Sequence, residues 1–179
     1  MRKIKRFLTL ALATVIAVSS LTITSKAASR ADENRHDLTA AQIATISTIF
    51  DASYYAKAYP DVVDTLGTSD AATLFNHFIS FGIWEERQPS AKFNVDVYAS
   101  RNADLQEKYG SDIIGYYVNY VTNLKTDTWR VTPTLNDAYA KGATIYSVYD
   151  FVQGQKGVKA GAVPVQTPTY APALGIGVK

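Results

Sequence analysis

The chain has 179 residues, of which 47% are hydrophobic, 12% aromatic and 19% charged, and it contains no cysteine. This composition excludes a collagen, a coiled coil and a disulfide scaffold, and it is typical of one modest domain or a short repeat array. The formal net charge is +2 at pH 7, and a nucleic-acid partner would require that the basic residues form a binding face.

The first 27 residues have the organisation of a secretory signal peptide. A basic start precedes an apolar run from Phe7 to Ile23, and Ser25-Lys26-Ala27 has the small-residue form that signal peptidase accepts. Removal of residues 1–27 takes away five basic residues and no acidic one, which leaves a net charge of −3. We therefore expect a secreted protein, either released or associated with the cell wall, and no nucleic-acid partner.

The alternative to cleavage is a retained membrane anchor, because about 17 apolar residues are just enough to span a bilayer. The small-residue exit favours cleavage. No later stretch is long and apolar enough to span a membrane, and no cysteine is present to carry a lipid. We expect no membrane span once the signal peptide is removed.

The residues after the signal peptide are predicted to form a polar linker over 28–37. The stretch from Leu38 to Ile49 is predicted to be an N-terminal capping helix. Thr39 and Gln42 have the spacing of a capping box, in which each side chain binds the other residue's backbone N–H.

An internal repeat organises residues 38–132, which we take as the helical repeat domain. Shifting the sequence by 43 residues aligns two units, 50–92 and 93–132, without a gap, and a fixed period in this range is typical of stacked supersecondary units. The identical pairs are Phe50 and Phe93, Tyr55 and Tyr98, Ala56 and Ala99, Asp61 and Asp104, Gly67 and Gly110, and Asn76 and Asn119.

Each unit is predicted to contain three short helices. Asp51 and Asn94 are placed to cap the first helix, and the glycines Gly67 and Gly110 are placed to end the second. The expected fold class is all-α: two stacked three-helix repeats with an N-terminal capping helix.

Beyond the repeats the helical pattern weakens. Residues 133–153 are predicted to be a weak helical extension, with one helix from Thr144 to Val152. Residues 154–179 are rich in Gly, Pro and Val without a helical period, and they are predicted to be a flexible tail.

The first unit contains four motifs in order: Phe50-Asp51-Ala52-Ser53-Tyr54-Tyr55, Tyr59-Pro60-Asp61-Val62, Asn76-His77-Phe78 and Gly82-Ile83-Trp84-Glu85-Glu86-Arg87. With these motifs the repeat region resembles a helical repeat of secreted and cell-surface bacterial proteins, closely in the first unit and in a degenerate form in the second. In that family the last motif has the form G-x-x-E-G-R, so Glu86 stands at the usual glycine. The resemblance covers about 85 residues of the chain and implies an all-helical secreted module, often found with cell-wall or polysaccharide-active domains. The family brings no activity to named residues.

Two structural ion pairs follow from the repeat. Arg87 is predicted to pair with Asp61 and to fasten the exit of the first unit to its second helix, and Arg130 with Asp104 should do the same in the second unit. The acidic residues Asp51, Asp61, Asp64 and Asp70 lack EF-hand spacing, so no metal site is predicted.

A catalytic site is a weaker interpretation. Glu85 and Glu86 would have to act as the two carboxylates of a glycosidase, or His77 as a general base. Adjacent residues rarely converge on one substrate, and His77 has no evident nucleophile. No catalytic residues and no cofactor are therefore predicted.

The aromatic residues are the best candidates for binding. Trp84 and Trp129 lie in predicted loops, and Tyr54 and Tyr59 combine apolar area with a hydroxyl, as sugar faces and protein interfaces require. The leading hypothesis is a noncatalytic secreted module that binds a cell-wall glycan or a surface protein. Two alternatives stay open: a small hydrolase using Glu85, Glu86 or His77, and a structural or partner-binding fragment.

Overall fold

The computed structural model describes residues 26–123, 130, 135, 138 and 141–165. These residues form an all-α structure, as predicted, and contain no β-strand beyond two isolated bridges. The helices, in chain order, are α1 (Lys26–Asn34), α2 (Ala40–Ser47), α3 (Ala52–Ala58), α4 (Pro60–Leu66), α5 (Ala71–His77), a π-helical turn η1 (Phe78–Gly82), α6 (Val95–Arg101), α7 (Ala103–Tyr109), α8 (Ile113–Asn123) and a 3-10 turn η2 (Val148–Asp150).

The helix ends follow the local rules that the sequence suggested. Thr39 and Gln42 form the capping box of α2, and Asp51 accepts a hydrogen bond from the N–H of Tyr54 at the start of α3. Pro60 opens α4 at a position where no N–H is needed, and Gly67 ends it in the left-handed conformation. These side chains and glycines decide where one short helix stops and the next begins.

Helices α3, α4 and α5 form a first triplet, and α6, α7 and α8 form a second. The first two helices of each triplet repeat at the predicted interval. Helices α6 and α7 begin and end 43 residues after α3 and α4. Asn94 caps α6 as Asp51 caps α3, by accepting from the N–H of Val97. Inside each triplet a tyrosine hydroxyl bonds the third helix: Tyr55 contacts Nδ1 of His77 at 3.1 Å, and Tyr98 donates to Oδ1 of Asn119 at 2.8 Å.

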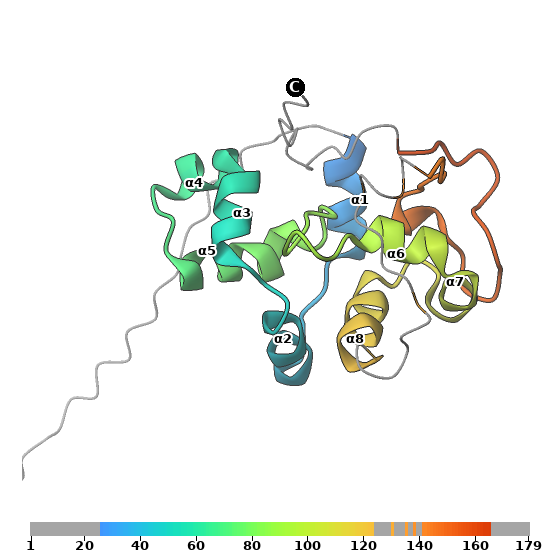
Figure 1. Ribbon diagram of the computed structural model, residues 1–179, viewed down its shortest axis with the longest axis horizontal. Coiled ribbons are helices and arrows are strands. Elements are labelled where there is room, and N and C mark those ends of the chain that lie inside the picture. The colour runs from blue at the N-terminus through green and yellow to red at the C-terminus, as the bar shows by residue number, and fades with distance from the viewer. Residues whose placement is uncertain (1–25, 124–129, 131–134, 136–137, 139–140, 166–179) are drawn as a thin grey trace, which may run out of the picture.

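The triplets lie at opposite ends of the molecule, with α1 between them (Figure 1). Among the described residues, the extensive helix contacts fall within each triplet, between α2 and α8, and between α6 and η2. Segment 83–93 joins the triplets: the N–H of Gln88 donates to the hydroxyl of Tyr59, and the hydroxyl of Tyr117 donates to the carbonyl of Arg87. One continuous apolar core includes residues of both triplets and of α1 and η2. Stacking of one whole unit on the other stays a prediction.

The predicted linker over 28–37 is wrong, because residues 26–34 form α1. Its Ala31 is only 1% exposed and belongs to the core, and Nη2 of Arg30 lies 2.7 Å from Oδ1 of the buried Asp150. Among the α1 side chains whose burial the structure describes, Ala31 packs against the core, and the ion pair of Arg30 orients the helix. Neither contact leaves a hydrophobic period in the sequence. The signal peptide itself falls on residues 1–25, outside the described residues, and on the first two residues of α1.

The predicted helix from Thr144 to Val152 is also wrong beyond a single 3-10 turn at Val148–Asp150. The N–H of Val148 donates to side-chain carboxylates of other segments instead of to a helical carbonyl. The remainder of the predicted extension over 133–153 falls largely outside the described residues.

The prediction of a flexible tail from residue 154 is wrong for residues 154–165, which are held by hydrogen bonds of their backbone N–H groups. The N–H of Gly154 donates to the carbonyl of Glu107, and that of Gly157 donates to the side chain of Gln106 on α7. The N–H of Val165 donates to the carbonyl of Ile145 at 2.7 Å. Residues 166–179 lie outside the described residues.

Candidate functional site

Two of the predicted binding aromatics are buried. Trp84 is 1% exposed and Tyr59 is 2% exposed, so neither projects from the surface. Tyr59 is instead fixed inside the first triplet, where its ring lies under the guanidinium of Arg87 at 5.0 Å. Both side chains belong to the joint core of the two triplets, so neither projects as a surface contact residue, and a binding role for either stays a prediction.

Neither of the other two binding candidates, Tyr54 and Trp129, is a described core residue. Tyr54 is half-buried, and its hydroxyl donates to the side chain of Gln88 at 3.0 Å. Burial raises the pKa of its hydroxyl, which therefore stays a neutral donor. Trp129 lies outside the described residues.

The ion pair predicted for the first unit is present. Arg87 is buried and its guanidinium is shared: Nη2 lies 3.0 Å from Oδ2 of Asp61, and Nε donates to Oε2 of Glu85 at 2.7 Å. The group therefore connects the exit of the first triplet to α4, as the sequence indicated.

The second unit repeats this pair. Nη2 of Arg130 pairs with Asp104, and Nη1 donates to Oδ1 of Asp104 at 2.9 Å and to the side chain of Asn102 at 3.0 Å. The hydrogen bond from Arg130 lowers the pKa of Asp104. Both arginines thus join the end of a triplet to its second helix.

The residues named for a hydrolase do not meet in one place. Glu85 is bonded to Arg87, and His77 is bonded to Tyr55. Burial lowers the pKa of His77, and the charge of Arg87 lowers it further, so the imidazole is neutral at pH 7. Glu86 faces a different neighbourhood, with Asp96 and Ser147. None of the three lines the pocket described next.

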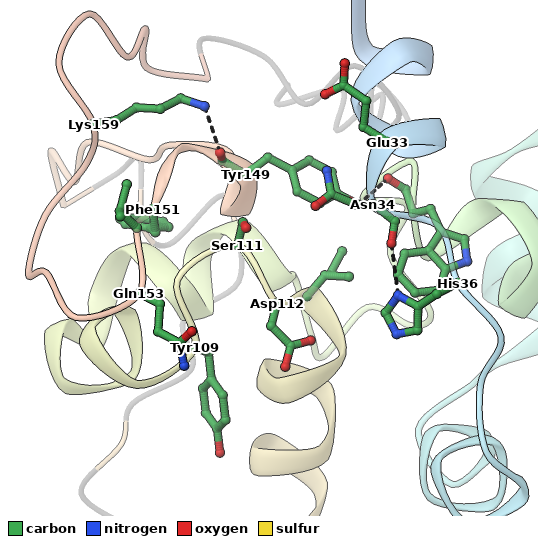
Figure 2. Close-up of a pocket in the computed structure, with 13 residues that line it drawn as sticks. Glu33, Asn34, His36, Tyr109, Ser111, Asp112, Tyr149, Phe151, Gln153 and Lys159 are labelled. Atoms are coloured by element: carbon green, nitrogen blue, oxygen red, sulfur yellow. Dashed lines mark hydrogen bonds between the residues drawn. The ribbon is translucent and has the colours of Figure 1, made fainter.

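A pocket of about 570 Å³ opens between three segments that are distant in the sequence. Figure 2 shows its residues: the end of α1 and the residues after it on one side, the turn between α7 and α8 below, and the segment from η2 onward on the other side. Its lining consists of Glu33, Asn34, His36, Trp84, Tyr109, Ser111, Asp112, Ile113, Tyr149, Phe151, Val152, Gln153 and Lys159. The volume lies within the range of about 300–1,000 Å³ that is common for small-ligand sites.

Buried rings form the base of this pocket, and polar side chains form its rim. The hydroxyl of Tyr149 donates to the carbonyl of Trp84 at 2.7 Å, and this hydrogen bond joins the segment from η2 onward to segment 83–93. The exposed ring of His36 lies on the buried indole of Trp84, with 4.7 Å between ring centroids. Trp84 therefore acts in this site as a support for His36.

Hydrogen bonds hold several rim groups in place. Nδ1 of His36 is bonded to the carbonyl of Asn34 at 3.0 Å. Oδ1 of Asp112 accepts from the N–H of Gly115 at 3.1 Å, in the first turn of α8. The side chain of Gln153 donates to the carbonyl of Lys108 at 3.0 Å, and the ammonium of Lys159 donates to the carbonyl of Tyr149 at 3.0 Å. The rim thus presents fixed planar carboxylate and amide groups, an imidazole and a half-exposed tyrosine, Tyr109.

Sequence reasoning missed the rim residues Glu33, His36, Asp112 and Gln153 as a group. They come from three segments with no shared motif, two of which were predicted to be a linker and a weak helical extension. The available signal was the cluster of polar residues immediately before α2 and at the turn after Tyr109, and neither cluster is distinctive in a single sequence.

The described part of the chain holds no group of three or more His, Asp or Glu side chains arranged to bind a metal ion. Nor does it include a helix with the length and apolar character needed to cross a membrane. Comparison of the chain with protein-family models, curated proteins and solved structures finds no match. The resemblance to the bacterial surface repeat therefore stays a prediction.

Proposed function

We propose that the protein is a noncatalytic extracellular module that binds a glycan of the bacterial cell envelope in the pocket between α1, the α7–α8 turn and residues 149–153. The observation that carries the proposal is the chemistry of this pocket, in which fixed planar polar groups surround exposed aromatic faces. The signal-peptide pattern at the N-terminus supports an extracellular location.

The lining matches the chemistry of a sugar. Each ring of a glycan carries adjacent hydroxyls, which both donate and accept, together with an apolar C–H face. Carboxylates such as Glu33 and Asp112 accept hydrogen bonds, and amides such as Asn34 and Gln153 donate and accept them. The faces of His36 and Tyr109 supply apolar area beside these groups.

The proposal is tested by cosedimentation of the mature chain, beginning at Ala28, with purified cell-wall sacculi. The test variant carries Glu33→Ala, His36→Ala and Gln153→Ala, three exposed lining residues whose removal costs little stability. We expect the wild type to be retained and the test variant to lose at least about tenfold in affinity, which corresponds to about 1.4 kcal/mol. Soluble wall glycan fragments should compete with retention.

A matched control variant carries Asp64→Ala, Lys57→Ala and Ser69→Ala, which are exposed positions of the first triplet and do not line the pocket. It should bind as the wild type does. Equal retention of both variants would place any binding elsewhere on the molecule, and no retention of the wild type would contradict envelope binding and favour a protein partner.

A further inference from the structure

Glu86 has an uncommon backbone conformation and a partly buried side chain. Among the described residues it is the only one other than glycine with a positive φ, 59°. For a residue with a side chain this conformation costs about 1–2 kcal/mol, so the surrounding contacts must hold it.

The contacts of Glu86 lead to the segment that forms one wall of the pocket. Its Oε1 accepts from the hydroxyl of Ser147 and from the N–H of Val148, the latter at 3.1 Å. Oδ1 of the buried Asp96, on α6, accepts from the same N–H at 2.8 Å. Two carboxyl groups, one before α6 and one on it, thus accept hydrogen bonds from the same backbone N–H of the segment that begins at Ser147.

These two carboxyl groups are adjacent, because an oxygen of each accepts from the same N–H of Val148. Two ionised carboxylates this close repel each other away from bulk water, which favours a proton on one of them. Burial raises the pKa of both groups, and for Asp96 the charge of Glu86 raises it further. A carboxyl pair of this kind titrates as a unit.

The other charged groups around the pair do not replace the proton. From α1, Arg30 reaches this side but bonds Asp150 at 2.7 Å, and Lys159 lies 3.6 Å from the same carboxylate. Asp150, on η2, adds negative charge to the surroundings of Asp96. Burial raises the pKa of the nearby hydroxyls of Tyr117 and Tyr149, which are neutral. On the segment of Glu86 itself, Arg87 is bonded to Glu85 and Asp61.

We propose that Glu86 and Asp96 form a proton-binding clamp that fixes Ser147 and Val148, and with them the pocket wall from Tyr149 to Gln153. With the proton bound, both carboxyl groups accept from the wall and bond each other. Loss of the proton leaves two adjacent negative charges in a buried place, and the wall is released. Only the effect on ligand affinity rests on the proposed function; the clamp itself does not.

The direction of the pH dependence follows from proton linkage. In the unfolded chain both carboxyls titrate at about pH 4, whereas the folded pair keeps a proton to higher pH. The stabilisation by the clamp is therefore complete below that range and is lost as pH rises through the titration of the folded pair. Each pH unit within this window lowers the folding equilibrium constant by up to tenfold.

The direct test is ¹³C-carboxyl NMR of the wild type between pH 3 and 9, with the amide signals of Ser147 to Gln153 followed in the same samples. We expect Glu86 and Asp96 to retain one proton between them above the range in which ordinary carboxyls titrate, and the amide signals of the wall to shift with the same midpoint as that proton is lost. Ordinary titration of both carboxyls near pH 4, or wall amides that do not follow them, would overturn the proposal.

Variants separate the clamp from general effects of charge. Glu86→Gln and Asp96→Asn each supply an N–H in place of the shared proton, so either should flatten the pH dependence of unfolding across the range in which the wild-type pair loses its proton. Asp64→Asn removes an exposed carboxylate elsewhere and should leave the dependence as in the wild type. A dependence unchanged in both clamp variants would overturn the proposal, and the NMR titration decides if one of them fails to fold.

Sacculi binding at pH 5 and pH 8 then connects the clamp to the pocket. We expect wild-type affinity to fall at least about threefold at pH 8 and Glu86→Gln to bind equally at both pH values. Binding of neither protein at either pH would contradict the proposed function, whereas the NMR titration would still decide the clamp. Equal wild-type binding at both pH values would overturn the link from clamp to pocket.

Discussion

Replacing Gly110 with alanine is expected to lower the free energy of unfolding by about 3 kcal/mol or more. Gly110 ends α7 with φ 54° and ψ −122°, a region that only glycine adopts readily. An ideal Cβ at this position would lie 2.2 Å from the backbone nitrogen of Gln153 and 2.8 Å from its Cα. Because the neighbour is backbone, no side-chain rotation relieves the overlap, and the pocket wall itself would have to move.

A second glycine gives the matched control for this prediction. Gly67 ends α4 with a similar φ of 64°, but an added Cβ there meets no atom within 4 Å. Gly67→Ala should therefore show only the backbone cost, about 1 kcal/mol. Urea unfolding of both variants and the wild type measures the difference. Equal losses in the two variants would contradict the close approach of residues 152–153 to α7.

The parts of the structure that the sequence predicted are those set by local rules and by the repeat. Capping by Thr39 and Asp51 and termination at Gly67 depend on neighbours within a few residues, which a single sequence displays. The pairing of Arg87 with Asp61 and of Arg130 with Asp104 could be predicted because the repeat places the same two residue types in both units.

The parts that the sequence did not predict are held by contacts between distant segments. Segment 141–165 does not form the helix that its pattern predicted, because its backbone groups bond to Glu86, Asp96 and Gln106 from other elements. Helix α1 reaches the core through Ala31 and an ion pair. The pocket exists only once these two segments lie beside the α7–α8 turn, so its residues could not be grouped from spacing alone.

Arg87→Ala is the second substitution with a large expected effect, a loss of about 3 kcal/mol of unfolding free energy. The side chain of Arg87 is 7% exposed, and its removal leaves a cavity above Tyr59 and a carboxylate at Glu85 without its partner. Asp61, by contrast, is 62% exposed at its side chain, so water can solvate it when the arginine is gone.

This contrast predicts how the stabilisation divides between the two carboxylates. In double-mutant cycles measured by urea unfolding, Arg87 and Asp61 should couple by no more than about 1 kcal/mol, because that pair is open to solvent on one side. Coupling of Arg87 with the more buried Glu85 should be the larger of the two. The packing of the guanidinium on Tyr59 then accounts for the rest of the loss. Two results would contradict this account: a loss of under about 1 kcal/mol for Arg87→Ala, or a cycle with Asp61 that carries most of the effect. In either case Arg87 would act as part of a surface ion pair and not as a buried connection between α4 and the exit of the first triplet.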